Sequence, residues 1–355
     1  MKRTANLGLS VALLIVVLAT VSYPQAAAPQ GPQFKTKAEY DAYNGAFTEK
    51  APAKKAELAE TFLNTYKESD ISFRTNAYMM MVKGLLDAQN FPKTMDSASK
   101  VAEALPNMPN ERKATIYSYG MDAATKSDNV QKAIEFGDKV LSISPEDANT
   151  LITLAGLIPE RLPTDEAGRK TALEKAEGYA TKAQAVVAKI FSGPKPGSMS
   201  DADWNNQKNS IEAGLHSNLG FIALNRMEYD KSVSEYEQAI KATPKDGIAQ
   251  FRLGLAYSGQ ATIAGKSYLA SVDAANEAVK NNADEAVRND LKAKVDVAGE
   301  AAAKKRDQAI DTLATAVALG GVVAEPARAQ LVKLYQVKNG STEGLDQLIN
   351  SKKPQ

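Results

Sequence analysis

LHSNLGFIALNRMEYDKSVSEYEQAIKATP, residues 215–244, is the most regular stretch of this sequence. Its large and small residues alternate at i, i+3, i+4 and i+7, which places them on one face of a helix. Gly220 and Ala239 stand where a bulkier side chain would push two neighbouring helices apart, and Pro244 ends the second helix because proline cannot continue one. The stretch therefore predicts two antiparallel helices in close contact.

The same pattern returns along the chain: Leu219-Gly220 recurs as Leu253-Gly254, 34 residues later. The residues that carry the pattern in the first unit are, in order, Leu219, Gly220, Ala223, Tyr229, Tyr236, Ala239 and Pro244. This order resembles the tetratricopeptide repeat (TPR), a helix–turn–helix unit of about 34 residues. Weaker copies occur at 75–106 and 114–145. The resemblance implies an all-α protein, a TPR-like α-solenoid of antiparallel helix pairs.

Further segments fit this organisation less regularly. Helical hairpins are predicted at 37–67 and 327–349, a first helix at 148–158 with its partner at 167–190, and a second helix at 306–321. Gly, Pro and Ser are frequent at 192–205, which predicts a loop, whereas 266–305 has a helical pattern that exceeds one repeat helix. The predicted domains are a signal peptide at 1–28, TPR-like repeats at 34–191, a linker loop at 192–210, and TPR repeats at 211–350 with a helical insertion at 266–305.

The N-terminal segment has the layout of a secretory signal peptide. Lys2 and Arg3 precede an apolar run from Leu7 to Val21, and the small residues 26–28 follow. The run is shorter than the roughly 20 residues that span a membrane. We therefore expect an exported protein, periplasmic or secreted. Anchoring to the membrane by the uncleaved segment is the alternative.

Charge and composition limit the classes of function that this chain can have. The chain has 43 basic and 42 acidic residues, which become 41 and 42 when Lys2 and Arg3 are set aside with the signal segment. A nearly neutral chain has no general attraction to nucleic acid. Cysteine is absent and His216 is the one histidine, so a zinc site lacks its usual ligands and histidine-dependent catalysis rests on one residue. We predict no cofactor and no catalytic residue.

SGQATIAGKS, residues 258–267, is similar to a phosphate-binding loop because it ends in Gly-Lys-Ser. That motif needs four residues between its first glycine and Gly-Lys-Ser, and it follows a β-strand. Here five residues separate Gly259 from Gly265, and the preceding residues are helical in pattern. We therefore expect no nucleotide binding and predict a flexible turn between helices, lengthened to admit the insertion.

The TPR resemblance also implies a binding groove, because the first helices of that family line a concave face that holds a peptide or a partner helix. The positions that match are Asn76, Met79, Lys83, Ser118, Asp122, Ser217, Asn218, Phe221, Ile248, Phe251, Arg252 and Leu255. Asn218 and Arg252 match two positions of the clamp with which some members hold a C-terminal carboxylate, but Ile248 replaces the expected lysine. The aromatic and leucine positions indicate an apolar groove instead, which is either open or filled by residues 266–305.

Three other residues have two interpretations each. His216 is interpreted as a core or boundary residue rather than a catalytic base. Trp204 either packs on the nearest helix or forms a surface anchor for a ligand. In YMMMV (78–82), Tyr78 and Met81 are predicted in the core, which leaves Met79 for the groove.

The resulting hypothesis is a non-catalytic TPR scaffold of the bacterial cell envelope that binds a protein or peptide partner. One alternative is an accessory subunit or enzyme acting on the cell envelope, which a pair of carboxylates in one pocket would favour. The other is a structural module that self-associates through apolar groove residues. The sequence does not name the partner, because repeats share a scaffold while the groove side chains set specificity.

Overall fold

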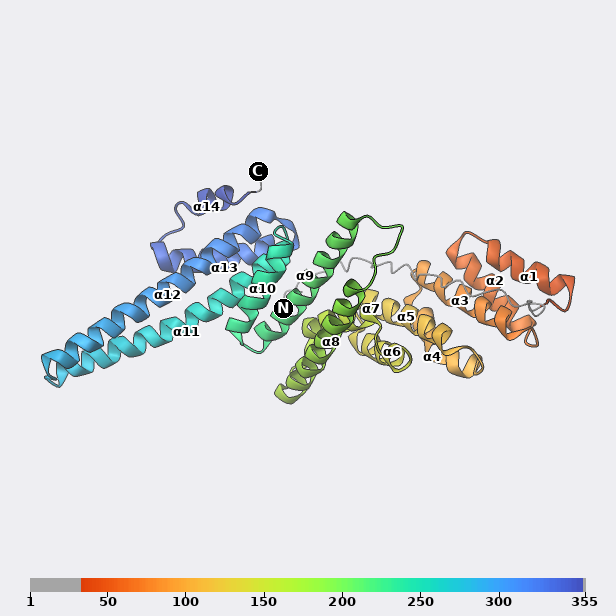
Figure 1. Ribbon diagram of the computed structural model, residues 1–355, viewed down its shortest axis with the longest axis horizontal. Helices are drawn as coiled ribbons and strands as arrows, with labels where there is room; N and C mark the ends of the chain where they lie inside the picture. The colour runs from red at the N-terminus through yellow and green to blue at the C-terminus, as the bar shows by residue number, and fades with distance from the viewer. Residues whose placement is uncertain (1–32, 354–355) are drawn as a thin grey trace. The chain divides into compact units, whose positions relative to one another are not determined.

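The computed structural model describes residues 33–353, so the predicted signal peptide lies outside the described residues. Figure 1 shows helices and no strand in this part of the chain, which confirms the all-α prediction. The described residues form two compact units. The N-terminal unit extends to Gly168 and includes Thr181–Val186, and the C-terminal unit comprises Arg169–Ala180 and the residues from Val187 onward. No described helix is long and apolar enough to span a membrane.

The N-terminal unit consists of successive helices joined by short turns. Their bounds are α1 Lys37–Thr48, α2 Pro52–Thr65, α3 Ile71–Asp87, α4 Phe91–Ala104, α5 Asn110–Lys126, α6 Val130–Ile143 and α7 Ala148–Leu157. The short 3₁₀ helix η1, Ile158–Arg161, precedes α8, Glu166–Ser192, which contributes residues to both units. Each helix packs against the next along the chain, so the predicted hairpin at 37–67 and the repeats at 75–106 and 114–145 are confirmed as helices.

The C-terminal unit continues the helix pairs. Its remaining helices are α9 Asp201–Asn225, α10 Tyr229–Ala242, α11 Gly247–Lys280, α12 Glu285–Leu319, the short 3₁₀ helix η2 Gly321–Val323, α13 Ala324–Asn339 and α14 Leu345–Ser351. One apolar cluster joins α10, α11 and the end of α12, with Tyr236 completely buried. A second joins α12 to α13 and α14, which confirms the terminal hairpin. Its turn contains Gly340 in the left-handed conformation.

Close contacts at glycine recur in successive repeats. A Cβ atom at Gly220 would lie 3.0 Å from the ring of Tyr236 in α10. At Gly120 the corresponding distance is 2.9 Å to Phe136 in α6, and at Gly254 it is 2.6 Å to Leu313 in α12. The same arrangement of a small residue against a large one therefore joins the two helices of three repeats, which is the TPR-like feature that the sequence predicts for Gly220.

Four inter-helix turns share one backbone conformation without using glycine. Gln89, Asp128, Met227 and Asn282 each have a positive φ of 49–61° directly after the first helix of a pair. In each turn the following residue donates its N–H to the carbonyl five residues earlier, as in Asn90 to Leu85 and Glu228 to Ala223, both at 2.9 Å. This is the Schellman pattern. Asp128 and Asn282 tolerate the left-handed conformation, whereas Gln89 and Met227 are strained in it. Helix packing therefore holds the turns at Gln89 and Met227 in a conformation that these side chains disfavour.

The linker is shorter than predicted. Ser200 caps α9, because its hydroxyl accepts the N–H of Asp203 at 3.1 Å and donates to the Asp203 carboxylate at 2.6 Å. Residues 201–210 are therefore helical, and the predicted linker loop at 192–210 is wrong for this part. Glycine and proline residues end α8, as expected. The next helix begins earlier than expected, because Ser200 lies three residues before Asp203 and caps the helix.

The prediction of a flexible turn at 258–267 is wrong, because this segment lies within the continuous helix α11. The helix continues through both glycines, each of which costs about 1 kcal/mol relative to alanine. Gly259 has a packing role instead: a Cβ atom there would overlap the ring of Tyr229. The backbone N–H groups of 258–267 lie inside the helix, where their partners are the carbonyls of the preceding turn.

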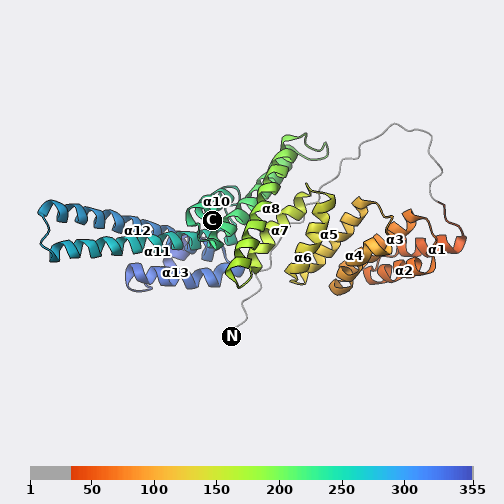
Figure 2. The same ribbon diagram turned by 90° about the horizontal axis from the view of Figure 1, so that it is seen from below.

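The insertion at 266–305 consists of prolongations of two repeat helices rather than of separate helices. Figures 1 and 2 show α11 and α12 side by side along their whole length, extending past α10. Gly254 faces Leu313 and Gly299 faces Tyr268, so a single antiparallel register runs through both contacts. We call residues 266–280 of α11 and 285–305 of α12 the arm.

Candidate functional site

A pocket of about 280 Å³ lies in the N-terminal unit, between the start of α2 and the helices α3 and α5. Its lining residues are Lys50, Pro52, Lys55, Met79, Met80, Lys83, Gly84, Asp87 and Tyr119. Gly84 lets α2 approach α3, because a Cβ atom there would lie 2.7 Å from the carbonyl oxygen of Pro52. The close approach of these two helices therefore shapes the pocket.

Positive charge surrounds the pocket. Lys83 forms an ion pair with Asp87, the one carboxylate in the lining, at 2.5 Å. Lys50 is exposed and Lys55 is half-buried, and neither forms an ion pair with another described residue. The nearby carboxylate of Glu49 accepts the backbone N–H groups of Ala51 and Lys50 at 2.8 and 2.7 Å; these bonds lower its pKa, and the charge of Lys55 contributes less. Two ammonium groups therefore remain available to an acidic ligand.

Methionine and tyrosine side chains form the apolar part of the pocket. Met79, Met80 and Tyr119 are all half-buried. Arg112 approaches this floor, with its guanidinium nitrogen 3.7 Å from the sulfur of Met79. Burial raises the pKa of the Tyr119 hydroxyl, although nearby Lys83 and Arg112 act in the opposite direction. The side chain of Tyr119 is therefore neutral and partly shielded from water, with Lys83 and Arg112 nearby. It is suited to contact the apolar part of an anionic ligand.

The predicted groove positions of the N-terminal unit are only partly brought together. Met79 and Lys83 line the pocket, whereas Asn76 is exposed on α3 and does not. Ser118 donates its hydroxyl to the Ala114 carbonyl at 3.0 Å, and Asp122 pairs with Lys126 at 2.9 Å. Tyr78 and Met81 are buried, as predicted.

The predicted groove positions of the C-terminal unit lie on α9 and α11. All seven are half-buried: Ser217, Asn218, Phe221, Ile248, Phe251, Arg252 and Leu255. The guanidinium of Arg252 lies 3.6 Å from the centre of the Phe221 ring, so a cation covers one of the apolar residues expected in the groove. Phe251 packs against the apolar cluster of α12–α14. This surface is therefore more polar and more strongly tied to the core than the sequence indicates.

The arm does not fold back over these positions. Its residues belong to the same two helices that carry the repeats, and the two halves of the arm pack against each other, with Tyr268 beside Gly299. Figure 1 shows the arm leading away from α9 and α10. Of the two alternatives, filling of the groove by residues 266–305 is thus wrong.

His216 and Trp204 both have neighbours in the C-terminal unit. The Nδ1 atom of His216 lies 2.8 Å from a carboxylate oxygen of Glu235, which connects α9 to α10 and confirms a boundary position. The ring of Trp204 lies 4.5 Å from that of Phe191 at the end of α8. Of its two interpretations, packing on the nearest helix is confirmed.

The pocket of the N-terminal unit contains one carboxylate, Asp87, and a second pocket within the arm also contains one, Glu285. The pair of carboxylates that would favour the enzyme alternative is therefore not seen in either. Among residues 33–353, no three side chains of His, Cys, Asp or Glu are grouped so that they could hold a metal ion.

Comparisons with known proteins add little to this geometry. No family model matches the sequence. No curated protein matches it either. Among solved structures, the chain is similar to one in the "Crystal structure of APC/C hetero-tetramer Cut9-Hcn1", with 13% identity, a TM-score of 0.23, and coverage of 83% of this chain and 55% of that chain. At this TM-score the similarity does not support a conclusion about the fold. The description of the fold rests instead on the helix pairs given above.

Sequence reasoning missed most of the pocket. Lys50, Pro52 and Lys55 belong to a hairpin that precedes the recognisable repeats, and Tyr119 is adjacent to the predicted Ser118. A signal was present in the first case: the run from Glu49 to Lys55 contains three lysines and a proline. Its approach to α3 depends on the small size of Gly84, which no local pattern reveals.

Proposed function

We propose that this chain is a non-catalytic scaffold whose N-terminal unit binds a segment of a partner protein. The observation that supports this proposal is the pocket between α2, α3 and α5, where Lys50 and Lys55 stand beside Met79, Met80 and Tyr119. The chemistry favours an extended or helical peptide that presents acidic side chains next to an apolar one. Methionine is adaptable and fits side chains of different shapes, so apolar selectivity is expected to be broad.

The size of the pocket supports a peptide over a small-molecule cofactor. At about 280 Å³ it is near the lower end of the roughly 300–1,000 Å³ typical of small-molecule sites. It accommodates one or two side chains, while the flanking ammonium groups attract carboxylates outside it. Such contacts mainly set the orientation and the rate of association, and they weaken as the salt concentration rises.

Binding to labelled peptides tests this proposal. We expect a library of Asp, Glu, Leu and Met peptides to bind the full chain at least about tenfold more tightly than a Lys, Arg, Leu and Met library, a difference of about 1.4 kcal/mol. Lys55→Glu should weaken binding of the acidic library by about tenfold, because it reverses a half-buried charge in the pocket. Fluorescence anisotropy measures both effects.

Lys54→Glu is the matched control. Lys54 is adjacent in sequence and carries the same charge, but it pairs with Glu57 at 2.9 Å and does not line the pocket. Its replacement should leave the affinity within about twofold of the parent, because exposed ion pairs contribute little. Equal binding of both libraries, or equal effects of the two substitutions, would contradict an acidic partner at this pocket.

We also propose that the scaffold functions outside the cytoplasm, in a bacterial periplasm or at the cell surface. The support is the layout of residues 1–28, with basic residues before a short apolar run and small residues after it. Mass spectrometry of the native N-terminus should find a chain that begins near residue 29. Recovery of a chain that begins at Met1 from the membrane fraction would instead support the uncleaved anchor.

A further inference from the structure

The arm carries a regular row of charges on α12. Arg288, Lys292, Asp296 and Glu300 follow one another at intervals of four residues, two cations and then two anions. We call these four residues the charge stripe. All four are exposed, and over three intervals at 1.5 Å per residue they extend along about 18 Å of helix. Residues four apart are neighbours on a helix surface, so the stripe is continuous.

Within a single helix the charge stripe contains two unfavourable neighbour pairs. Arg288 beside Lys292 and Asp296 beside Glu300 are like-charged neighbours, which destabilise a helix, and only the middle pair, Lys292 and Asp296, is of opposite charge. In the described residues none of the four forms an ion pair, whereas Asp290 and Lys294 on another side of α12 pair at 2.7 Å. The stripe thus lacks the local neutralisation that α12 shows elsewhere, and a charged partner would provide it.

The order of charges makes the stripe complementary to itself. When two copies of α12 lie antiparallel, Arg288 is opposite Glu300 and Lys292 is opposite Asp296, and the two-fold axis repeats both pairs. A parallel arrangement would place like charges together. The symmetry of the stripe therefore matches a two-fold dimer, in which the same surface of both copies forms the contact.

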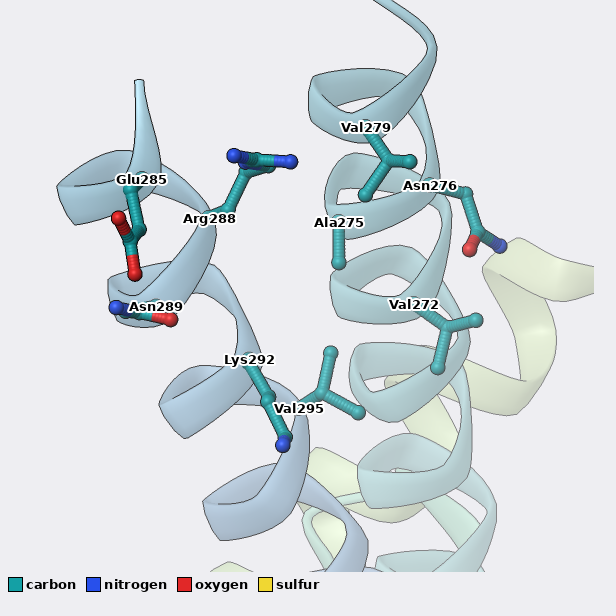
Figure 3. A pocket seen from close by; sticks show the side chains of 9 residues that line it. All are labelled: Val272, Ala275, Asn276, Val279, Glu285, Arg288, Asn289, Lys292 and Val295. Carbon is teal, nitrogen blue, oxygen red and sulfur yellow. The ribbon is translucent and has the colours of Figure 1, made fainter. Parts of the chain in front are cut away.

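Apolar side chains accompany the stripe. Figure 3 shows Val272, Ala275 and Val279 of α11 across from Val295, with Arg288 and Lys292 at the edge of a pocket of about 500 Å³. Within this pocket Val279 is 58% exposed, and Val272, Ala275 and Val295 are half-buried. Two helices alone leave these groups in water, and a second pair of helices would cover them.

We propose that the arm is a homodimerisation surface on which two copies of the chain pair through antiparallel α12 helices. The stripe sets the direction and register of the pairing. Exposed ion pairs contribute little affinity each, so the valines of the pocket beside the stripe supply the remainder. This surface differs from the apolar groove positions on α9 and α11, and the inference does not depend on the peptide pocket of the N-terminal unit.

Analytical ultracentrifugation of the full chain, at protein concentrations from about 1 to about 100 μM, tests the proposal. This range covers dimers with dissociation constants in the micromolar range. The parent should form a dimer. R288E/K292E makes the stripe wholly acidic and D296K/E300K makes it wholly basic, so each variant alone should be monomeric or at least about tenfold weaker in self-association. An equimolar mixture of the two should form a heterodimer. The fourfold variant R288E/K292E/D296K/E300K restores complementarity and should dimerise like the parent.

Two controls separate pairing from folding. D290K/K294D exchanges an ion pair on another side of α12 without a change in net charge, and it should leave the dimer intact. Circular dichroism should show the helical content of the parent in every variant, and recovery in the mixture excludes unfolding of the single-sign variants. A parent that remains monomeric over the whole range, or single-sign variants that dimerise as strongly as the parent, would overturn the proposal.

Discussion

Replacement of Gly220 by leucine is expected to lower the free energy of unfolding of the C-terminal unit by about 1–3 kcal/mol. A Cβ atom at this position lies 3.0 Å from the Tyr236 ring, which is tighter than an ordinary contact, and leucine adds three further carbons. Tyr236 is completely buried and has little space into which to move. The helices α9 and α10 would therefore have to separate.

Helix propensity acts in the opposite direction, because leucine is favoured over glycine inside a helix by up to about 1 kcal/mol. Gly214 provides the matched control, since it lies in the same helix α9 with no other atom near its Cβ position. Gly214→Leu should stabilise the unit by up to about 1 kcal/mol. Chemical denaturation of both variants and the parent measures the difference.

An unchanged or raised midpoint for Gly220→Leu would show that the TPR-like register at 213–246 is wrong. The groove assignment on α9 and α11 uses the same register and would fail with it. Because neighbouring repeats stabilise one another, the destabilisation should extend into α11. Hydrogen exchange of the α11 amides can detect that spread.

Replacement of Phe136 by alanine is expected to lower the free energy of unfolding of the N-terminal unit by about 3–5 kcal/mol. Phe136 is completely buried in α6, where it packs against the backbone of α5 at Gly120. The substitution removes a ring from the contact that holds this helix pair together, and the surrounding helices cannot close the cavity fully.

Phe47→Ala is the corresponding control, since Phe47 is 61% exposed on α1 of the same unit. It should alter the free energy of unfolding by less than about 1 kcal/mol, as is usual for substitutions at the surface. Denaturant titration followed by circular dichroism compares the two. Similar small losses for both would mean that the α5–α6 contact contributes little to the unit.

The helices and their pairing were predictable because they depend on patterns that repeat within a few residues. Gly220 and Ala239 mark the close contact of one pair, and Pro244 marks the end of a helix. The turns were harder to predict from the sequence. Met227 and Gln89 adopt the left-handed conformation although neither residue favours it, so the usual signal of a glycine is missing.

The length of α11 and α12 was not predictable for a similar reason. Residues 258–267 contain two glycines, which argue locally for a break. The helix continues because Gly259 packs beneath Tyr229 and the alanines around it favour helix, so tertiary contact overrides a local signal. In the pocket, Met79 and Lys83 were predictable from repeat positions, whereas Lys55 depends on how closely α2 approaches α3.

Trp204 gives the chain an intrinsic optical probe. It is the only tryptophan among 355 residues, and its partner ring, Phe191, lies in the same C-terminal unit. Indole emission therefore reports on that unit alone, whereas the far-ultraviolet dichroism of the backbone reports on the helices of both. Coincident transitions by the two signals would indicate a single cooperative unfolding event, and separate transitions would indicate units that melt independently. When the transitions are separate, the loss of stability from a substitution can be assigned to one unit without an added dye.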